Sequence, residues 1–84
     1  MKLSKDYDVF ASGHKLFLAN IENGDLFEIN DVVYDLVNAC QFVDSVEELC
    51  AVIYAKYKNE DADYSKEDLK EFVDDMLRSG ILEK

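Results

Sequence analysis

The stretch that decides the fold is Asn20–Asn30, which reads N-I-E-N-G-D-L-F-E-I-N. Its Asn23-Gly24 pair predicts a two-residue type I′ hairpin turn, because both central positions of that turn need a positive φ. The residues after the turn alternate as a short strand. We expect Phe27 and Ile29 to face the core, since the other face of that strand carries a charge. The final asparagine of the stretch ends the strand and opens a helix.

The chain before this turn predicts two more strands. They cover residues 7–11 and 15–20, and a turn at Ser12-Gly13-His14 separates them. The three strands together form an antiparallel meander, which is the minimum for stability when one face is covered. Residues 1–6 are polar and are expected to fray.

The chain after the turn predicts three helices, because apolar residues recur there at i, i+3, i+4 and i+7. The first runs from about Asp31 to Cys40. The second opens with Ser45-Val46-Glu47-Glu48, a capping-box pattern in which the glutamate reaches back to the serine. The third follows a similar signature at Ser65 and runs to about Ser79, where Gly80 suits a left-handed helix end.

The apolar stripe of the third helix is broader than the packing of a small sheet requires. It contains Leu69, Phe72, Val73, Met76 and Leu77. We therefore expect part of this face to be left over for a groove. The sequence as a whole predicts an α+β fold, with a three-stranded antiparallel sheet followed by three helices in a single domain over residues 1–84.

The composition of the chain limits the classes of molecule that this protein is expected to bind. Nineteen acidic and nine basic side chains give a net charge of −10, which repels phosphate backbones and anionic membranes. There is no apolar run long enough for a membrane span or a signal peptide, so we expect a cytoplasmic protein. Cys40 and Cys50 lie on the helical stripes and are expected to be buried free thiols.

The sequence shows no grouping of residues that is typical of a catalytic or metal-binding site. His14 is the single histidine, and the three glycines are scattered. The acidic segment 60–63 lacks the spacing of a calcium loop and is most simply a solvated surface. We therefore expect no catalytic residues, no metal and no cofactor.

Two other classes of protein share features with this chain. Asp44-Ser45-Val46 resembles the Asp-Ser-Leu site of acyl carrier proteins, where Ser45 would carry phosphopantetheine. A capping box already explains this serine, and strands replace the long first helix of a carrier. A DNA-binding winged helix shares the fold, but Glu71, Asp74 and Asp75 oppose contact with phosphates.

From Leu16 to Leu82 the pattern resembles the PqqD-like family, the peptide chaperones of pyrroloquinoline quinone biosynthesis, and more generally the recognition domains for ribosomally made, modified peptides. The matching motifs are F-E-I-N at 27–30, the helix ending at Cys40, S-V-E-E-L at 45–49 and D-L-K-E-F-V-D-D-M-L-R-S-G-I-L at 68–82. Ile29 replaces the leucine that most relatives carry.

The resemblance implies a winged-helix-like α+β fold. It also implies that the chain binds the leader of a precursor peptide as a fourth strand and delivers it to a maturation enzyme. That enzyme would be a radical SAM maturase, a cyclase or a leader peptidase. The binding edge would consist of Gly24, Asp25, Leu26, Phe27, Glu28 and Ile29. Such addition of a strand gives sequence-tolerant affinity through backbone hydrogen bonds. The unpaired edge also allows weak homodimers.

Specificity would come from a groove between this strand and the third helix. We expect its apolar lining to be Leu26, Leu69, Phe72 and Met76. Acidic residues at the rim, namely Glu28, Asp68 and Asp75, would favour a lysine or arginine in the leader.

Overall fold

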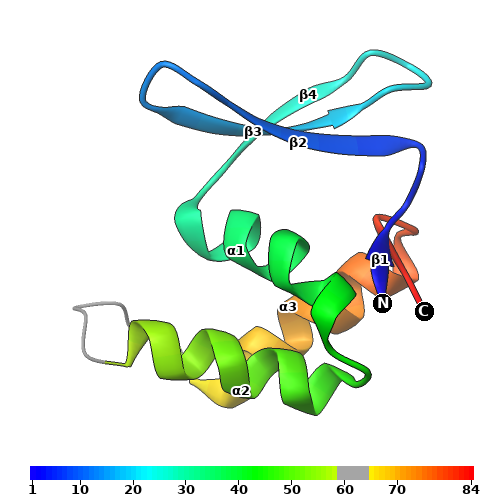
Figure 1. The fold of residues 1–84 in the computed structure, drawn as a ribbon. Coiled ribbons are helices and arrows are strands. Elements are labelled where there is room, and N and C mark those ends of the chain that lie inside the picture. Colours follow the sequence, from blue (N-terminus) through cyan, green and yellow to red (C-terminus); the bar gives the residue numbers. More distant parts are fainter. Residues whose placement is uncertain (59–64) are drawn as a thin grey trace.

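A computed structural model describes residues 1–58 and 65–84 of the chain, and the acidic segment 60–63 lies outside this range. The molecule has three layers (Figure 1). An antiparallel sheet lies over helix α1, and helices α2 and α3 lie on the other side of α1. The α+β, winged-helix-like arrangement predicted from the sequence is confirmed.

The sheet contains the three predicted strands, β2 (Tyr7–Ser12), β3 (Lys15–Asn20) and β4 (Leu26–Ile29). They are antiparallel neighbours in the order β2-β3-β4, so β4 forms one edge. Its first residue is Leu26 and not Asp25, which lies in the preceding loop.

The helices begin where their capping residues predict. They are α1 (Asp31–Ala39), followed by the short 3-10 turn η1 (Cys40–Phe42), then α2 (Val46–Tyr57) and α3 (Lys66–Arg78). Ser65 and Asp68 form a complete capping box. At α2, Ser45 accepts from the Glu48 N–H as expected, but the Glu48 carboxylate accepts from the Asp44 N–H, one residue before the serine. The predicted second half of that box is therefore wrong.

The core lies among the helices. Its fully buried side chains come from α1, η1, α2, α3 and the chain end: Leu36, Cys40, Leu49, Ile53, Leu69, Val73 and Leu82. Those on the helices are stripe positions, because a helix buries residues three and four apart. Both cysteines are free and buried, as predicted.

The loop between β3 and β4 differs from the predicted type I′ turn. Gly24 has a φ of 79°, but no non-glycine residue in the described part of the chain has a positive φ, so Asn23 does not meet that turn's requirement. The loop is wider and is held by Asn20, whose side-chain oxygen accepts from the N–H groups of Glu22 and Asn23. A side chain that caps a loop in this way replaces the second left-handed residue.

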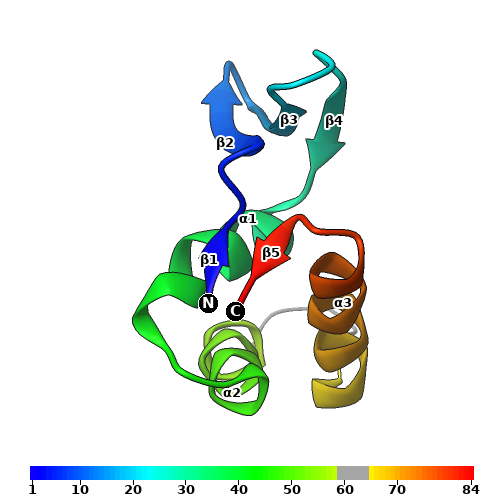
Figure 2. The same cartoon turned by 90° about the vertical axis from the view of Figure 1, so that its right-hand side faces the viewer.

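The N-terminus is ordered by pairing with the C-terminus, which corrects the expectation that residues 1–6 fray. Strand β1 (Lys2–Leu3) pairs antiparallel with β5 (Leu82–Glu83). Ser4 is buried, and its N–H donates to the Ile81 carbonyl at 2.9 Å. The pairing joins the two ends of the chain beside α3, as Figure 2 shows.

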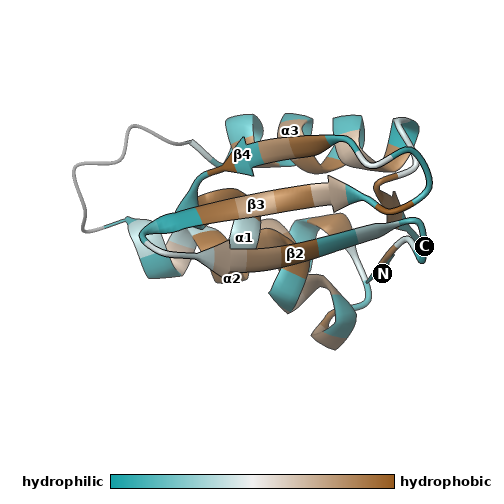
Figure 3. Ribbon diagram, turned by 90° about the horizontal axis from the view of Figure 1, so that it is seen from above, coloured by the Kyte–Doolittle hydropathy of each residue, from teal (hydrophilic) through white to brown (hydrophobic). Residues whose placement is uncertain are grey.

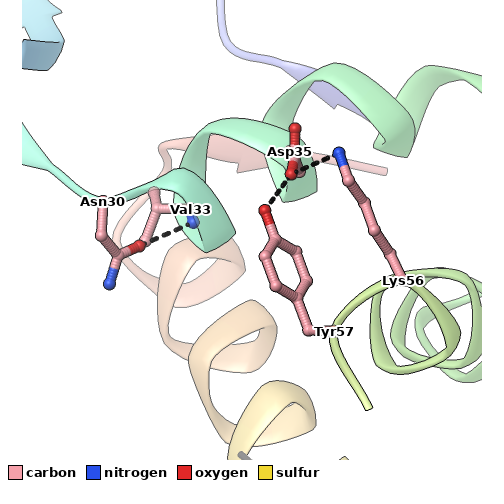
Figure 4. Close-up of polar contacts among 5 residues, drawn as sticks. All are labelled: Asn30, Val33, Asp35, Lys56 and Tyr57. Carbon is pink, nitrogen blue, oxygen red and sulfur yellow. Dashed lines mark hydrogen bonds and ion pairs between the residues drawn. The ribbon is translucent and has the colours of Figure 1, made fainter. Parts of the chain in front are cut away.

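A polar contact ties α1 to α2 (Figure 4). The Asp35 carboxylate accepts a hydrogen bond from the Tyr57 hydroxyl and pairs with Lys56 at 2.8 Å. Partial burial raises the pKa of Asp35, but the hydrogen bonds from Lys56 and Tyr57 outweigh it, and the pKa lies below its ordinary value of 3.8. The ionised carboxylate therefore stabilises the fold.

The first prediction concerns this contact. Tyr57→Phe should lower the free energy of unfolding by about 1–2 kcal/mol at pH 7, because it removes a hydrogen bond to a charged group. The contribution of Asp35 is present above about pH 4 and is lost as the pH falls through its lowered folded pKa, so the difference should shrink at pH 3. Urea unfolding followed by circular dichroism measures both.

The matched control is Tyr34→Phe, on the same helix as Asp35. The Tyr34 hydroxyl forms no hydrogen bond within residues 1–58 and 65–84, so this change should stay within about 0.5 kcal/mol. An equal loss in the two variants would contradict the assigned contact.

Candidate functional site

The free edge of β4 is the first part of the site. The Asn20 N–H donates to the Asp25 carbonyl at 2.8 Å, one position beyond the last paired residues of β3 and β4, so Asn20 and Asp25 occupy a hydrogen-bonding position of the ladder. In an antiparallel ladder such pairs alternate with pairs that exchange no hydrogen bonds. The backbone groups of Phe27 and Ile29 therefore point toward β3.

The same alternation directs the backbone groups of Leu26 and Glu28 away from β3. These are two N–H and two C=O groups on an edge with which no strand of the described chain pairs. Figure 2 and Figure 3 both place β4 on the α3 side of the sheet and β2 on the far side. The open hydrogen-bonding edge thus lies on the same side as α3.

The two faces of β4 divide as the alternation predicts. Phe27 is opposite Leu18, and Ile29 packs against the core, so both side chains point toward the helices. Phe27 is nevertheless 50% exposed, because the edge of the sheet extends past the core. Phe27 therefore faces the helices as predicted, but it is only about half buried.

Leu26 and Glu28 point to the outer face of the sheet, away from α3. Leu26 is paired with Ala19 and is 55% exposed, and Glu28 forms an ion pair with Lys15 at 3.4 Å. The expectations that Leu26 lines the groove and that Glu28 stands at its rim are corrected. Both residues contribute backbone groups to the edge, and Phe27 takes the place of Leu26 on the inner face.

A groove along α3 is the second part of the site. Its volume is about 500 Å³. The residues that line it share one face of the helix or follow its end: Asp68, Glu71, Phe72, Asp75, Met76, Ser79 and Ile81. Four of them were expected there, namely Asp68, Phe72, Asp75 and Met76. We predicted that part of the broad apolar stripe of α3 stays outside the core. This prediction is confirmed, since Phe72 is 43% exposed.

The other lining residues were not identified from the sequence. Leu69, which was expected in the groove, is 1% exposed and belongs to the core. Glu71 and Ser79 lie four residues from positions that were expected, so helical periodicity extended by one turn would have found them. Ile81 reaches the groove because Gly80, with a φ of 80°, turns the chain back over the helix end. The Ile81 N–H donates to the Met76 carbonyl at 2.9 Å.

The acidic side chains of the groove differ in how far their charges are compensated by neighbouring groups. Asp75 forms an ion pair with Arg78, one turn further along the helix. Asp68 accepts from the Ser65 N–H at 3.2 Å and lies at the N-terminus of α3, where the helix dipole favours a negative charge. The Glu71 side chain is exposed and forms no ion pair or hydrogen bond within the described part of the chain. It is thus the uncompensated charge of the groove.

The remaining candidates for chemistry have structural roles. Ser45 caps α2 through its hydroxyl. Burial raises the pKa of the Cys40 and Cys50 thiols, so both are protonated and poor nucleophiles. Among residues 1–58 and 65–84, no three His, Cys, Asp or Glu side chains are grouped as metal ligands. No helix in those residues has the length and apolar character to cross a membrane.

Comparison with known proteins identifies the family and supports the fold. The family model described as coenzyme PQQ synthesis protein D (PqqD) matches residues 15–82, and the chain belongs to this family. The solved structure of TbiB1 in complex with the TbiA(beta) leader peptide shares the fold, with a TM-score of 0.63 and 19% sequence identity. The match covers 94% of this chain and 86% of TbiB1. Curated proteins gave no significant match.

The second prediction separates the core from the groove on α3. Leu69→Ala should lower the free energy of unfolding by about 2–5 kcal/mol, because it leaves a cavity in a packed core. Phe72→Ala should cost less than about 1.5 kcal/mol, because much of its ring is already in water. Urea unfolding of the two variants measures the difference. Equal losses would place Phe72 in the core and contradict the assigned groove.

Proposed function

We propose that this protein is a non-catalytic adaptor that binds the leader region of a ribosomally synthesised precursor peptide. The leader adds to the sheet as a fourth strand along β4, above the groove of α3. The observation that supports this most strongly is the open edge at Leu26 and Glu28 on the same side of the molecule as an apolar groove.

The backbone supplies the affinity that does not depend on sequence. An extended peptide can exchange hydrogen bonds with the outward N–H and C=O groups of Leu26 and Glu28. Each such bond contributes about 0.5–1.5 kcal/mol net. The strand is short, so these bonds alone do not offset the ordering of a disordered leader, which costs roughly 2–5 kcal/mol.

Side-chain burial supplies the remaining binding free energy. Phe27 on the sheet side and Phe72 on the helix side are each about half exposed. Full burial of a phenylalanine side chain is worth about 1.5–3 kcal/mol, and roughly half of that remains to be gained at each position. We expect micromolar affinity, about −8 kcal/mol.

Two comparisons support the peptide as the ligand. The family model describes a coenzyme synthesis protein, and TbiB1, whose solved structure shares this fold, is in complex with a leader peptide. The adaptor then presents the bound precursor to a modifying enzyme of the same biosynthetic system, namely a radical SAM maturase, a cyclase or a leader peptidase. The adaptor's own side chains take no part in that reaction.

The free edge also allows weak self-association in the absence of the leader, because two copies of β4 can pair with each other. The net charge of −10 opposes such a dimer. A bound leader occupies the same backbone groups and should leave the protein monomeric.

The third prediction tests the added strand. The neighbouring genes are first searched for a short precursor peptide. The probe is the fluorescein-labelled leader of that candidate precursor, with proline placed at each position in turn. Proline removes an N–H, so it should weaken binding about tenfold or more at alternate positions and much less at the positions between them. Fluorescence anisotropy measures each dissociation constant.

Weaker binding with proline at every second position would show that the leader binds as a strand. A leader that binds equally well with proline at every position would rule out strand addition. A leader without measurable binding would rule out the adaptor function for that precursor.

A further inference from the structure

The groove of α3 changes in character along its length. Its N-terminal end is acidic, with Asp68 and Glu71, and its C-terminal end is uncharged and mostly apolar, with Met76 and Ile81 beside Ser79. Asp75 lies between them, but its charge is compensated by Arg78. The groove therefore has one charged end and one apolar end.

The negative charge at Glu71 is reinforced by its neighbours on the helix. The residues three and four positions away on either side are all acidic: Glu67, Asp68, Asp74 and Asp75. Like charges at these spacings destabilise a helix by about 0.2–0.5 kcal/mol per pair. A cation at Glu71 would relieve this repulsion, whereas an anionic ligand would add to it.

The direction of a bound strand follows from the arrangement of β4 and α3. Figure 1 and Figure 3 show that β4 and α3 run in opposite directions. Antiparallel pairing is the more stable kind, and it is the pairing that β4 already makes with β3. A peptide antiparallel to β4 runs in the same direction as α3, so its N-terminal part lies at the acidic end.

We infer that the leader carries a lysine or arginine followed by a large apolar residue, and that Glu71 selects the basic side chain. This inference rests on the proposed function. Glu71 and Ser79 are separated by roughly 12 Å of helix, and an extended strand covers that distance in about four residues. Residues four apart in a strand share a face, so both side chains can point into the groove.

The test is selection from a phage library that displays random twelve-residue peptides, with the immobilised full chain as bait. The wild-type pool should be enriched in lysine or arginine about four residues before a leucine, isoleucine, phenylalanine or methionine. The Glu71→Lys pool should lose this preference and favour aspartate or glutamate at the same position. The control is Glu67→Lys, which makes the same change of charge one turn away and outside the groove, and it should keep the basic preference.

A quantitative arm uses one selected peptide, synthesised with its lysine and with alanine in its place. Replacement of the lysine should weaken binding to the wild type by up to roughly fivefold at low salt, and the loss should shrink as salt screens the charges. Glu71→Gln, a milder change, should weaken binding of the lysine peptide by a similar factor and leave the alanine peptide unaffected.

Three outcomes would overturn the inference. A wild-type pool with apolar anchors and no basic preference would refute the role of Glu71 while the proposed function stands. An equal shift in the Glu67→Lys pool would show a general effect of charge. A wild-type bait that enriches no peptides would contradict the proposed function itself.

Discussion

The register of β4 against β3 is the constraint on which the rest of the structure depends. Because strand side chains alternate with a period of two, a slip of one residue would move Phe27 and Ile29 to the outer face and turn Leu26 and Glu28 inward. It would also exchange the backbone groups that point to the open edge. The Asn20 side chain holds the loop before β4 and so helps to set this register, which decides the residues that would pair with a leader in the proposed complex.

The helical half of the fold and its core were predictable from the sequence, because stripes of period 3.6 and capping residues are local signals. The groove was predictable in part: the excess width of the α3 stripe indicated Phe72 and Met76. The pairing of Lys2 and Leu3 with the chain end was not predictable, since contacts between the termini leave no local pattern. The prediction that Leu26 and Glu28 lie in the groove was wrong. Their backbone groups point to the open edge, but alternation along the strand directs their side chains to the outer face of the sheet.

The small size of the domain accounts for the exposed aromatic side chains beside β4 and α3. A chain of 84 residues buries a smaller share of its surface than a larger protein, and its core here lies among the helices. The sheet contributes Leu18 as its buried residue and leaves Phe27 half exposed. A peptide strand along β4 would cover this surface, so the ligand would complete the packing that the chain leaves unfinished.

The most direct measurement is amide hydrogen exchange of the ¹⁵N-labelled protein with and without the leader peptide. We expect the amides of Leu26 and Glu28, which point to the open edge, to gain protection on binding. The amides of Phe27 and Ile29 already donate toward β3 and should change little. Equal protection of all four amides, or protection confined to α3, would contradict the addition of a fourth strand at β4.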